Sequence, residues 1–291
     1  MAKPCDNADR SGRVEALVGL YGELRDRLKP LRFAPPAAHV YHTLDYAFAP
    51  FEQYLRRYAV RGASALLLGM NPGPWGMVQT GVPFGDVQSV GGWLAIDAGA
   101  QPPTQQHPQR PILGLACPRV EVSGQRIWGW AQGRFGSTAA FFERFFVLNY
   151  CPLAWLTESG ANLTPDKLPA KERLAVEHAC DAALRAAVEI LAPRWLIGVG
   201  KYAEQRAKAA LSAPTDGSPH DDDQRLPQIC TILHPSPASP AANRGWAEQA
   251  ERQLAAIGID LRSGRGESPR VQTAPIVNRR EKQLRGAAKR A

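Results

Sequence analysis

Four short apolar runs, each followed by a loop or a helical pattern, constrain the fold of this chain more than any other feature. The runs cover residues 65–69, 145–149, 195–200 and 228–233. None of them alternates strictly between apolar and polar residues, which is typical of parallel strands covered on both faces. Amphipathic helices are predicted around them, over residues 169–193, 201–211 and 243–258. The pattern predicts a three-layer α/β/α sandwich around a short four-stranded parallel sheet.

Two further helices are predicted ahead of the first run. An apolar stripe at helical spacing covers residues 13–28, and a second helix is expected to begin at Pro50. We therefore divide the 291 residues into a flexible N-terminus (1–12), one α/β domain (13–261) and a C-terminal tail (262–291). A chain of this length can bury the core of one large domain.

The positive charge of the chain is concentrated in the tail. Residues 262–291 hold nine Lys or Arg and two acids, whereas the other 261 residues hold 26 basic and 25 acidic residues. The composition of the tail is typical of a disordered segment. Two roles stay open for it, a solubilising tail or an arm that contacts DNA phosphates.

Composition also bears on compartment and cofactors. The chain has no run of 18 apolar residues and no apolar N-terminal stretch, so we expect no membrane partner and a cytoplasmic location. Five scattered cysteines without a CxxC pair predict no disulfide framework and no metal. His220 stands beside three aspartates in a predicted loop (212–227), and a solvated acidic loop explains it better than a metal site. We also expect no cofactor and a monomer.

Polar residues follow all four predicted strands. Asn71 comes after the first run, Asn149 ends the second, Lys201 follows the third and His234 follows the fourth. Because ligands of open α/β sheets bind beyond the carboxyl ends of the strands, we expect these residues at one edge. Each has a structural explanation when taken alone, as a turn former, a loop hydrogen-bond partner or a helix-opening residue. Their shared location favours a site.

The loop after the first run is the most unusual segment. Residues 69–86 hold five glycines and three prolines together with Phe84, whose ring alone would more often be a core residue. The segment lacks the GxGxxG of dinucleotide sites, and the chain lacks a P-loop GK[ST] and a GxSxG nucleophile elbow. Two amides, an imidazole and an aromatic ring suit a planar heterocycle, stacked on Phe84 and hydrogen-bonded at its edge.

Three motifs resemble those of a known family. The stretches "GMNPGPWGMVQTGVPFG", "NYCPL…NLTP" and "HPSP…ANRGW" are similar, in order and spacing, to motifs of the single-strand-selective monofunctional uracil-DNA glycosylases. The resemblance covers about residues 30 to 260 and implies a bacterial-type member of the uracil-DNA glycosylase superfamily. It implies hydrolysis of the N-glycosidic bond of uracil, and of C5-modified uracils such as 5-hydroxymethyluracil. The partner would be single- or double-stranded DNA, the product an abasic site, and the place of action the bacterial nucleoid.

The resemblance also carries roles for single residues. Asn71 matches the residue that orients the attacking water, and Phe84 matches the ring stacked on the flipped base. Asn149 matches the reader of the Watson–Crick edge, and His234 the histidine near O2. Because an amide takes up no proton near pH 7, Asn71 can orient the water but cannot act as a general base. Asp86, the nearest acid in the loop, is a weaker rival that could act as the base. The other base-contacting positions are Met70, Gly73 and Met77, the last two beside C5.

The loop that would enter the DNA departs from the family pattern. It comprises Ser236, Pro237, Ala238 and Ser239, and animal members carry a basic residue where Ala238 and Ser239 stand here. Arg244 is expected to reach a phosphate instead, at the start of a helix.

Three alternatives stay open at this point. The first is a mismatch-type glycosylase that acts on thymine or xanthine. The second is a non-catalytic reader of flipped or single-stranded bases. The third is attack on the sugar by Lys201, which would add strand cleavage to base removal.

Overall fold

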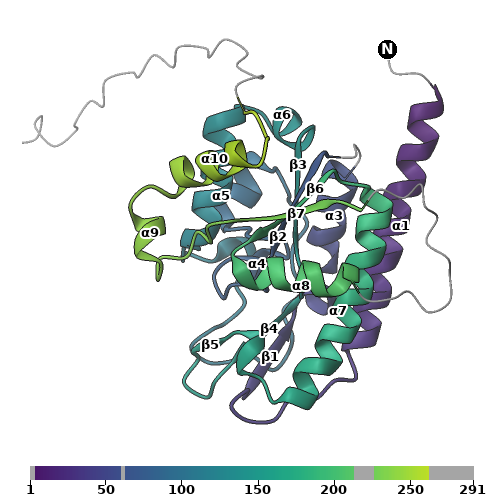
Figure 1. Cartoon of the computed structure of the whole chain (residues 1–291). Coiled ribbons are helices and arrows are strands. Elements are labelled where there is room, and N and C mark those ends of the chain that lie inside the picture. Colours follow the sequence, from purple (N-terminus) through teal and green to yellow (C-terminus); the bar gives the residue numbers. More distant parts are fainter. Residues whose placement is uncertain (1–3, 60–62, 213–225, 262–291) are drawn as a thin grey trace, which may run out of the picture.

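The computed structural model describes residues 4–59, 63–212 and 226–261 (Figure 1). The predicted basic tail (262–291) and the acidic loop around His220 lie outside these ranges.

A four-stranded parallel sheet forms the centre of the molecule. Its strands are β2 (Ala65–Gly69), β3 (Phe145–Asn149), β6 (Trp195–Val199) and β7 (Gln228–Ile232), in the order β3-β2-β6-β7. All neighbouring pairs are parallel, so the four carboxyl ends meet at one edge. The predicted parallel sheet is confirmed, with strand ends at most one residue from the predicted ones.

Helices cover both faces of this sheet, as expected for a three-layer α/β/α sandwich (Figure 1). On one side lie α1 (Pro4–Leu28), α3 (Phe48–Tyr58), α7 (Ala170–Leu191) and α8 (Lys201–Ser212). On the other side lie α5 (Val122–Phe135), α6 (Thr138–Phe142) and α10 (Trp246–Ala256).

Adjacent residues of β3 show how the two faces are packed. The ring of Phe146 stacks on Tyr54 of α3, with 5.3 Å between centroids. The ring of Phe145 points to the opposite face, where it contacts Trp130 of α5 at 5.7 Å. The alternation of strand side chains thus gives each helical layer its own aromatic contacts.

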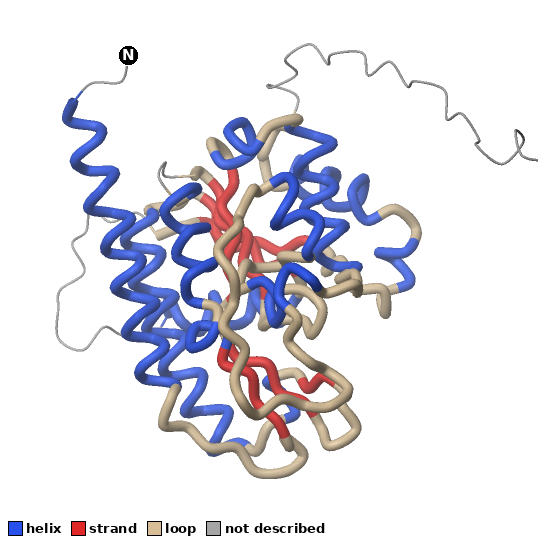
Figure 2. Tube along the Cα trace, turned by 180° about the vertical axis from the view of Figure 1, so that it is seen from behind, coloured by secondary structure: helices blue, strands red, loops and turns tan. Residues whose placement is uncertain are grey.

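A second, antiparallel sheet was not predicted. It consists of β1 (His39–His42), β4 (Leu153–Leu156) and β5 (Asn162–Leu163), in the order β1-β4-β5, and lies beside the main layers (Figure 2). β4 begins four residues after β3 ends, so the chain passes directly from one sheet to the other. Its strands are short, β5 has only two residues, and β4 is buried throughout, so no alternating pattern reveals them.

Several helix boundaries also differ from the predictions. Helix α1 begins at Pro4, so residues 4–12, predicted as a flexible N-terminus, are helical. Helix α3 begins at Phe48, two residues before Pro50. Helices α5 and α6 had not been predicted, because the glycines spread over residues 122–136 weaken the helical pattern in the sequence. The shorter elements are α2 (Thr43–Tyr46), α4 (Met77–Thr80), a π-helical turn η1 (Ser89–Trp93), the 3-10 turns η2 (Gly114–Ala116) and η3 (Pro165–Lys167), and α9 (Pro240–Asn243).

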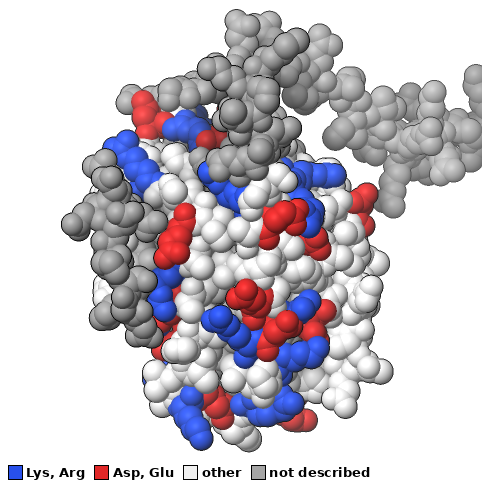
Figure 3. All heavy atoms as spheres, turned by 90° about the vertical axis from the view of Figure 1, so that its right-hand side faces the viewer, with Lys and Arg blue, Asp and Glu red and all other residues white. Residues whose placement is uncertain are grey.

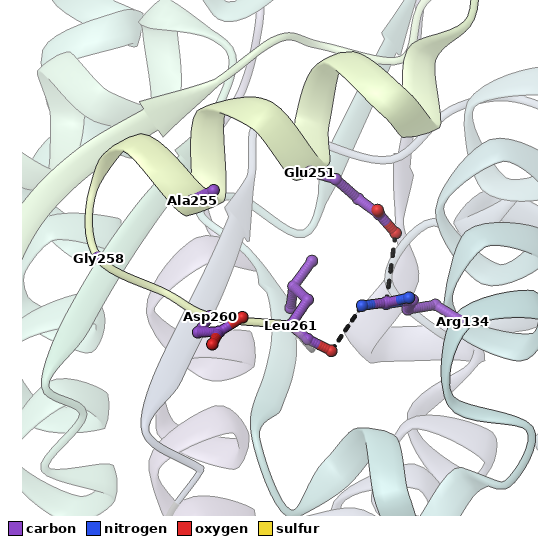
Figure 4. Close-up of a pocket in the computed structure, with 6 residues that line it drawn as sticks. All are labelled: Arg134, Glu251, Ala255, Gly258, Asp260 and Leu261. Carbon is purple, nitrogen blue, oxygen red and sulfur yellow. Dashed lines mark hydrogen bonds and ion pairs between the residues drawn. The ribbon is translucent and has the colours of Figure 1, made fainter. Parts of the chain in front are cut away.

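The last described residues are fastened to α5 and α10 around a small hollow (Figure 4). Arg134 donates a hydrogen bond to the Leu261 carbonyl at 2.6 Å and pairs with Glu251 at 3.6 Å. Trp130 also donates to Glu251, at 3.1 Å. Leu261, the last described residue, is therefore held by a hydrogen bond from α5.

Within the described ranges, no helix is long and apolar enough to cross a membrane. In the same ranges no three His, Cys, Asp or Glu side chains are grouped so that they could hold a metal ion. Cys117, Cys151, Cys180 and Cys230 are buried free thiols.

Candidate active site

A cavity of about 320 Å³ opens at the carboxyl edge of the parallel sheet. It brings together Asn71, Asn149 and His234, three of the four strand-end residues that the sequence placed at this edge, and the predicted stacking ring of Phe84. Predicted neighbours also line it: Met70, Gly73, Met77, Ser236 and Pro237. Pro72, Pro74, Glu121, Ser123, Asn162 and Thr164 complete the wall.

Two glycines allow the ring of Phe84 to reach the cavity. A Cβ on Gly69 would lie 2.1 Å from the Asn149 side-chain oxygen and 2.5 Å from the Phe84 ring. A Cβ on Gly124 would lie 2.1 Å from the Phe84 carbonyl. Phe84 itself has a φ of 53°, a region that non-glycine residues seldom adopt. The strained backbone and the two glycines present one ring face at the end of β2 and β3.

Asn149 is held in one orientation by its surroundings. Its side-chain NH₂ donates to the Met77 sulfur at 3.2 Å. Its side-chain oxygen is buried, and no described residue donates to it. Buried polar atoms in proteins nearly always have partners, so an orphaned acceptor on a residue that lines a cavity indicates a ligand N–H.

His234 lies across the cavity as a neutral hydrogen-bond donor. The backbone N–H of Ser236 donates to its Nδ1 at 3.1 Å, which leaves the proton on Nε2. Burial lowers the pKa of the imidazole, which also favours the neutral form. Its ring centre is 6.2 Å from that of Phe84. A base stacked on Phe84 would therefore meet Nε2–H at one edge.

Asn71 is also fixed. Its NH₂ donates to the Leu153 carbonyl at 3.2 Å, at the start of β4. This bond leaves the side-chain oxygen as the acceptor that can hold a water. The antiparallel sheet thus orients one residue of the site.

Glu121 is a cavity residue that the sequence analysis missed. It immediately precedes α5, and its carboxylate accepts from the Trp75 N–H at 3.4 Å. A Cβ on Gly73 would lie 2.4 Å from the carboxylate, so the two residues are in direct contact. Burial raises the pKa of this carboxyl, and the charge of Asp86 adds to the shift. The sequence analysis did not place this carboxylate in the pocket, because α5 had not been predicted.

The structure places the two rival catalytic groups outside the cavity lining. Asp86 is buried, and its carboxylate accepts from Ser89 Oγ at 2.6 Å and from the backbone N–H groups of Gln88 and Ser89 at 3.2 and 3.3 Å. These bonds give it a capping role at η1. Lys201 begins α8 as predicted, but it is exposed and does not line the cavity.

The loop after β7 is held from outside by Arg126 of α5, a second residue that the sequence analysis missed. Its guanidinium donates to the carbonyls of Pro235 and Ser236 at 2.9 and 3.3 Å and to the Asn243 side chain at 2.8 Å. Asn243 in turn donates to the Pro237 carbonyl at 2.9 Å. One guanidinium therefore fixes the loop on both sides of its tip.

The remaining loop residues lie at or beyond the rim. Ala238 is exposed, and Ser239 caps α9 by accepting from the Ala242 N–H at 3.3 Å. Arg244 is exposed but follows α9, whereas α10 begins at Trp246. The helix that was predicted to start around Arg244 begins two residues later, at Trp246, because Gly245 adopts a φ of 102° between the two helices.

Comparison with known proteins identifies one superfamily. The model of the uracil DNA glycosylase superfamily matches residues 56–255. A single-strand selective monofunctional uracil-DNA glycosylase of Rattus norvegicus is 44% identical over 259 residues, 89% of this chain and 88% of the relative. The protein of that name from Bos taurus is 44% identical over 238 residues, 81% of this chain and 84% of the relative. A solved structure of SMUG2 from Pedobacter heparinus has a TM-score of 0.54 at 16% identity, covering 82% of this chain and 96% of the other.

The fold and the pocket define a protein of the uracil-DNA glycosylase class. The chain belongs to the uracil-DNA glycosylase superfamily and, within it, to the family of single-strand selective monofunctional uracil-DNA glycosylases.

Proposed function

We propose that the protein is a monofunctional DNA glycosylase that hydrolyses the N-glycosidic bond of uracil in DNA and leaves an abasic site for base-excision repair. Its family membership gives the reaction class. The observation that carries the residue assignment is the orphaned, buried oxygen of Asn149, a residue that lines the same cavity as His234.

Asn149 supports selection of uracil. Its free oxygen accepts from uracil N3–H, and its NH₂, oriented by Met77, donates to O4. Cytosine presents an acceptor at N3 and a donor at C4, which opposes both groups. A site built to pair such polar groups can discriminate by roughly 10⁴ to 10⁵.

His234 and Asn71 support the chemical step. Bond cleavage leaves an oxocarbenium-like sugar and a uracil anion, and the His234 donor stabilises the negative charge that develops on O2. Asn71 orients the water through its side-chain oxygen without taking its proton. The reaction therefore depends mainly on departure of the base, because the amide of Asn71 takes up no proton near pH 7.

The space beside C5 supports removal of C5-modified uracils such as 5-hydroxymethyluracil. Met77 marks the O4 side of the ring through its contact with Asn149, so C5 faces the loop that holds Gly73. Gly73 has no side chain, and the Glu121 carboxylate lies against it. A hydroxymethyl group can donate a hydrogen bond to that carboxylate. The methyl group of thymine would instead displace water from the carboxylate and offer it no hydrogen bond.

The DNA partner must present its base outside the helix. Flipping a nucleotide costs a few kcal/mol, least for damaged or unpaired bases. Ser236 and Pro237 would enter beside the flipped nucleotide, followed by Ala238 and Ser239, and Arg244 would contact a phosphate. The protein would act as a monomer in the cytoplasm, at the bacterial nucleoid, with its basic tail near DNA phosphates.

The test uses a labelled oligonucleotide with one uracil, incubated with the full chain in EDTA and then divided into samples with and without hot alkali. Cleavage only after alkali is the expected result. Cleavage without alkali would instead indicate amine attack, with Lys201 as the first candidate. Parallel strands with thymine, xanthine, 5-hydroxymethyluracil and cytosine rank the pocket. Failure to form an abasic site in any strand would overturn the proposed function in favour of a non-catalytic reader.

A further inference from the structure

One half-buried aromatic residue beside the cavity, Trp75, contacts the guanidinium groups of two arginines. The guanidinium of Arg110 is 5.0 Å from the centre of the Trp75 ring, and that of Arg119 is 5.2 Å from it. Both distances fall in the range of cation–π contacts. Together these three residues form what we call the Arg–Trp–Arg ridge.

The ridge belongs to the rim of the cavity. Trp75 follows Pro74, a lining residue, and its N–H donates to the carboxylate of Glu121, another lining residue, at 3.4 Å. Arg119 precedes Glu121 by two residues. A strand whose nucleotide enters the cavity must therefore pass close to the ridge.

The ridge is held rigidly from below. Gln79 is fully buried, and its NH₂ donates to the carbonyls of Pro74 and Pro111, both at 3.0 Å. Its oxygen accepts from the Leu113 N–H at 2.8 Å. The hydroxyl of Tyr41 donates to the Arg110 carbonyl at 2.7 Å. One amide thus joins the loop that bears Trp75 to the loop that bears Arg110, so ligand binding would not have to order them.

The two ridge arginines lack the carboxylate partners that other arginines have. Neither forms an ion pair with a described residue, whereas Arg206 pairs with Glu177 and Asp181. On the face of the molecule that carries α1 and α7, basic and acidic side chains are interspersed (Figure 3). The ridge therefore presents two positive charges without internal neutralisation, directly beside a pocket for a base.

We infer that the Arg–Trp–Arg ridge binds backbone phosphates of the target strand next to the flipped nucleotide. Guanidinium groups match phosphate oxygens in charge and in donor geometry, and the Trp75 ring that they contact does not compete for their donors. Exposed side chains of Leu113 and Val120 lie in the same loops and offer apolar surface to the adjoining sugars. This inference rests on the proposed function, because it needs a DNA strand in the cavity.

The test measures kcat and kcat/KM on a single-stranded uracil oligonucleotide over a range of salt concentrations. Arg119→Gln and the double variant Arg110→Gln/Arg119→Gln are compared with the unchanged protein. The matched control is Arg194→Gln. Arg194 stacks on Trp195 at 4.2 Å and is also exposed, but it lies at the amino end of β6, the opposite edge of the sheet.

We expect kcat to be unchanged and kcat/KM to fall at low salt in the ridge variants only. For single strands the slope of log kcat/KM against log salt should fall by about 0.7 for each phosphate that the variant no longer binds. If the double variant had the same salt slope and kcat/KM as the Arg194→Gln control, the inference would be overturned. The proposed function would still hold in that case, because the parent protein would be active. An inactive parent protein would overturn the proposed function itself. Arg119 is exposed and pairs with no described carboxylate, so its replacement should not destabilise the fold. The single variant Arg119→Gln therefore provides the test if the double variant is unstable.

Discussion

The loops that follow β2 and β7 both deliver catalytic residues to the cavity, but they are held in different ways. The loop after β2 is supported from within. Its own Gln79 and Thr80 are buried and bond its carbonyls, those of Pro74 and Gly85, at 3.0 and 2.7 Å. The loop after β7 is supported from outside, by Arg126 of α5 at its tip and by side chains of α10 at its base.

This difference predicts that the two loops respond differently to substitution. The first loop fixes the ring of Phe84 and the wall near C5 as part of the core, so changes there should destabilise the fold. The second loop carries His234 and an exposed tip, so changes there should reduce activity while the fold survives. Substitutions of His234, Gln79 and Arg126 test this division.

Replacing His234 by alanine should give the largest effect on catalysis. Loss of a preorganised donor at a developing anion costs about 2.7 to 4 kcal/mol, or roughly 10² to 10³ in kcat. Single-turnover excision from a uracil oligonucleotide measures the loss. Binding to an oligonucleotide with an abasic analogue should stay unchanged, and a parallel loss of that binding would mean that the loop had collapsed.

Replacing Gln79 by methionine should lower stability more than any change in the second loop. The substitution keeps the volume but leaves two carbonyls and one N–H without their partner. We expect the free energy of unfolding to fall by about 2 to 3 kcal/mol. Urea denaturation measures it, with the exposed Gln88→Met as control. Equal stability of the two variants would refute internal support of the first loop.

Replacing Arg126 by glutamine should reduce activity with little loss of stability. The loop keeps its bonds to α10, but its tip loses three charge-assisted bonds, and we expect kcat to fall about tenfold. Arg126→Lys should not restore it, because a single ammonium cannot bridge the three acceptors. The control is Arg185→Gln, which removes a bond from α7 to the Ala210 carbonyl at 2.9 Å. A drop in melting temperature that accounts for the reduced activity would contradict the comparison.

The pH profile of kcat/KM should report the state of His234. Because burial lowers its pKa below the usual 6.5, the neutral donor persists through neutral pH. Below the folded pKa, activity should fall by up to about tenfold per pH unit, since a second proton displaces the Ser236 N–H from Nδ1. The unfolded chain binds more protons in this range, so stability should fall in the same direction. A rate that rises as pH falls through 6.5 would mean that the imidazolium is the active form.

The sequence predicted the parts of the molecule in which one physical signal dominates. The four central strands are continuous apolar runs, and their order fixed where Asn71, Asn149 and His234 would meet. The antiparallel sheet escaped because β5 has two residues and β4 is buried throughout. Such strands are defined by tertiary packing and by no pattern of their own.

The missed site residues have a common cause. Glu121 and Arg126 both belong to the start of α5, and without that helix neither could be placed near the sheet edge. Asp86 was the opposite case, since its position in the loop suggested the cavity. Its hydrogen bonds to Ser89 turn it toward η1 instead. The position of a residue in the sequence indicates the element on which it lies. The direction of its side chain depends on backbone turns such as the one at Phe84.

Reading of the base edge by Asn149 underlies the whole assignment of the site, and excision of uracil compared with cytosine tests it most directly. The parent protein and Asn149→Asp would be assayed on strands that differ only in that base. We predict excision of uracil alone by the parent protein, because discrimination of roughly 10⁴ to 10⁵ is within reach of such a site. We predict a large loss of uracil excision by the aspartate variant. We also predict detectable excision of cytosine, because a carboxylate can accept a hydrogen bond from the cytosine amino group. An unchanged preference for uracil at an unchanged rate would contradict this role of Asn149.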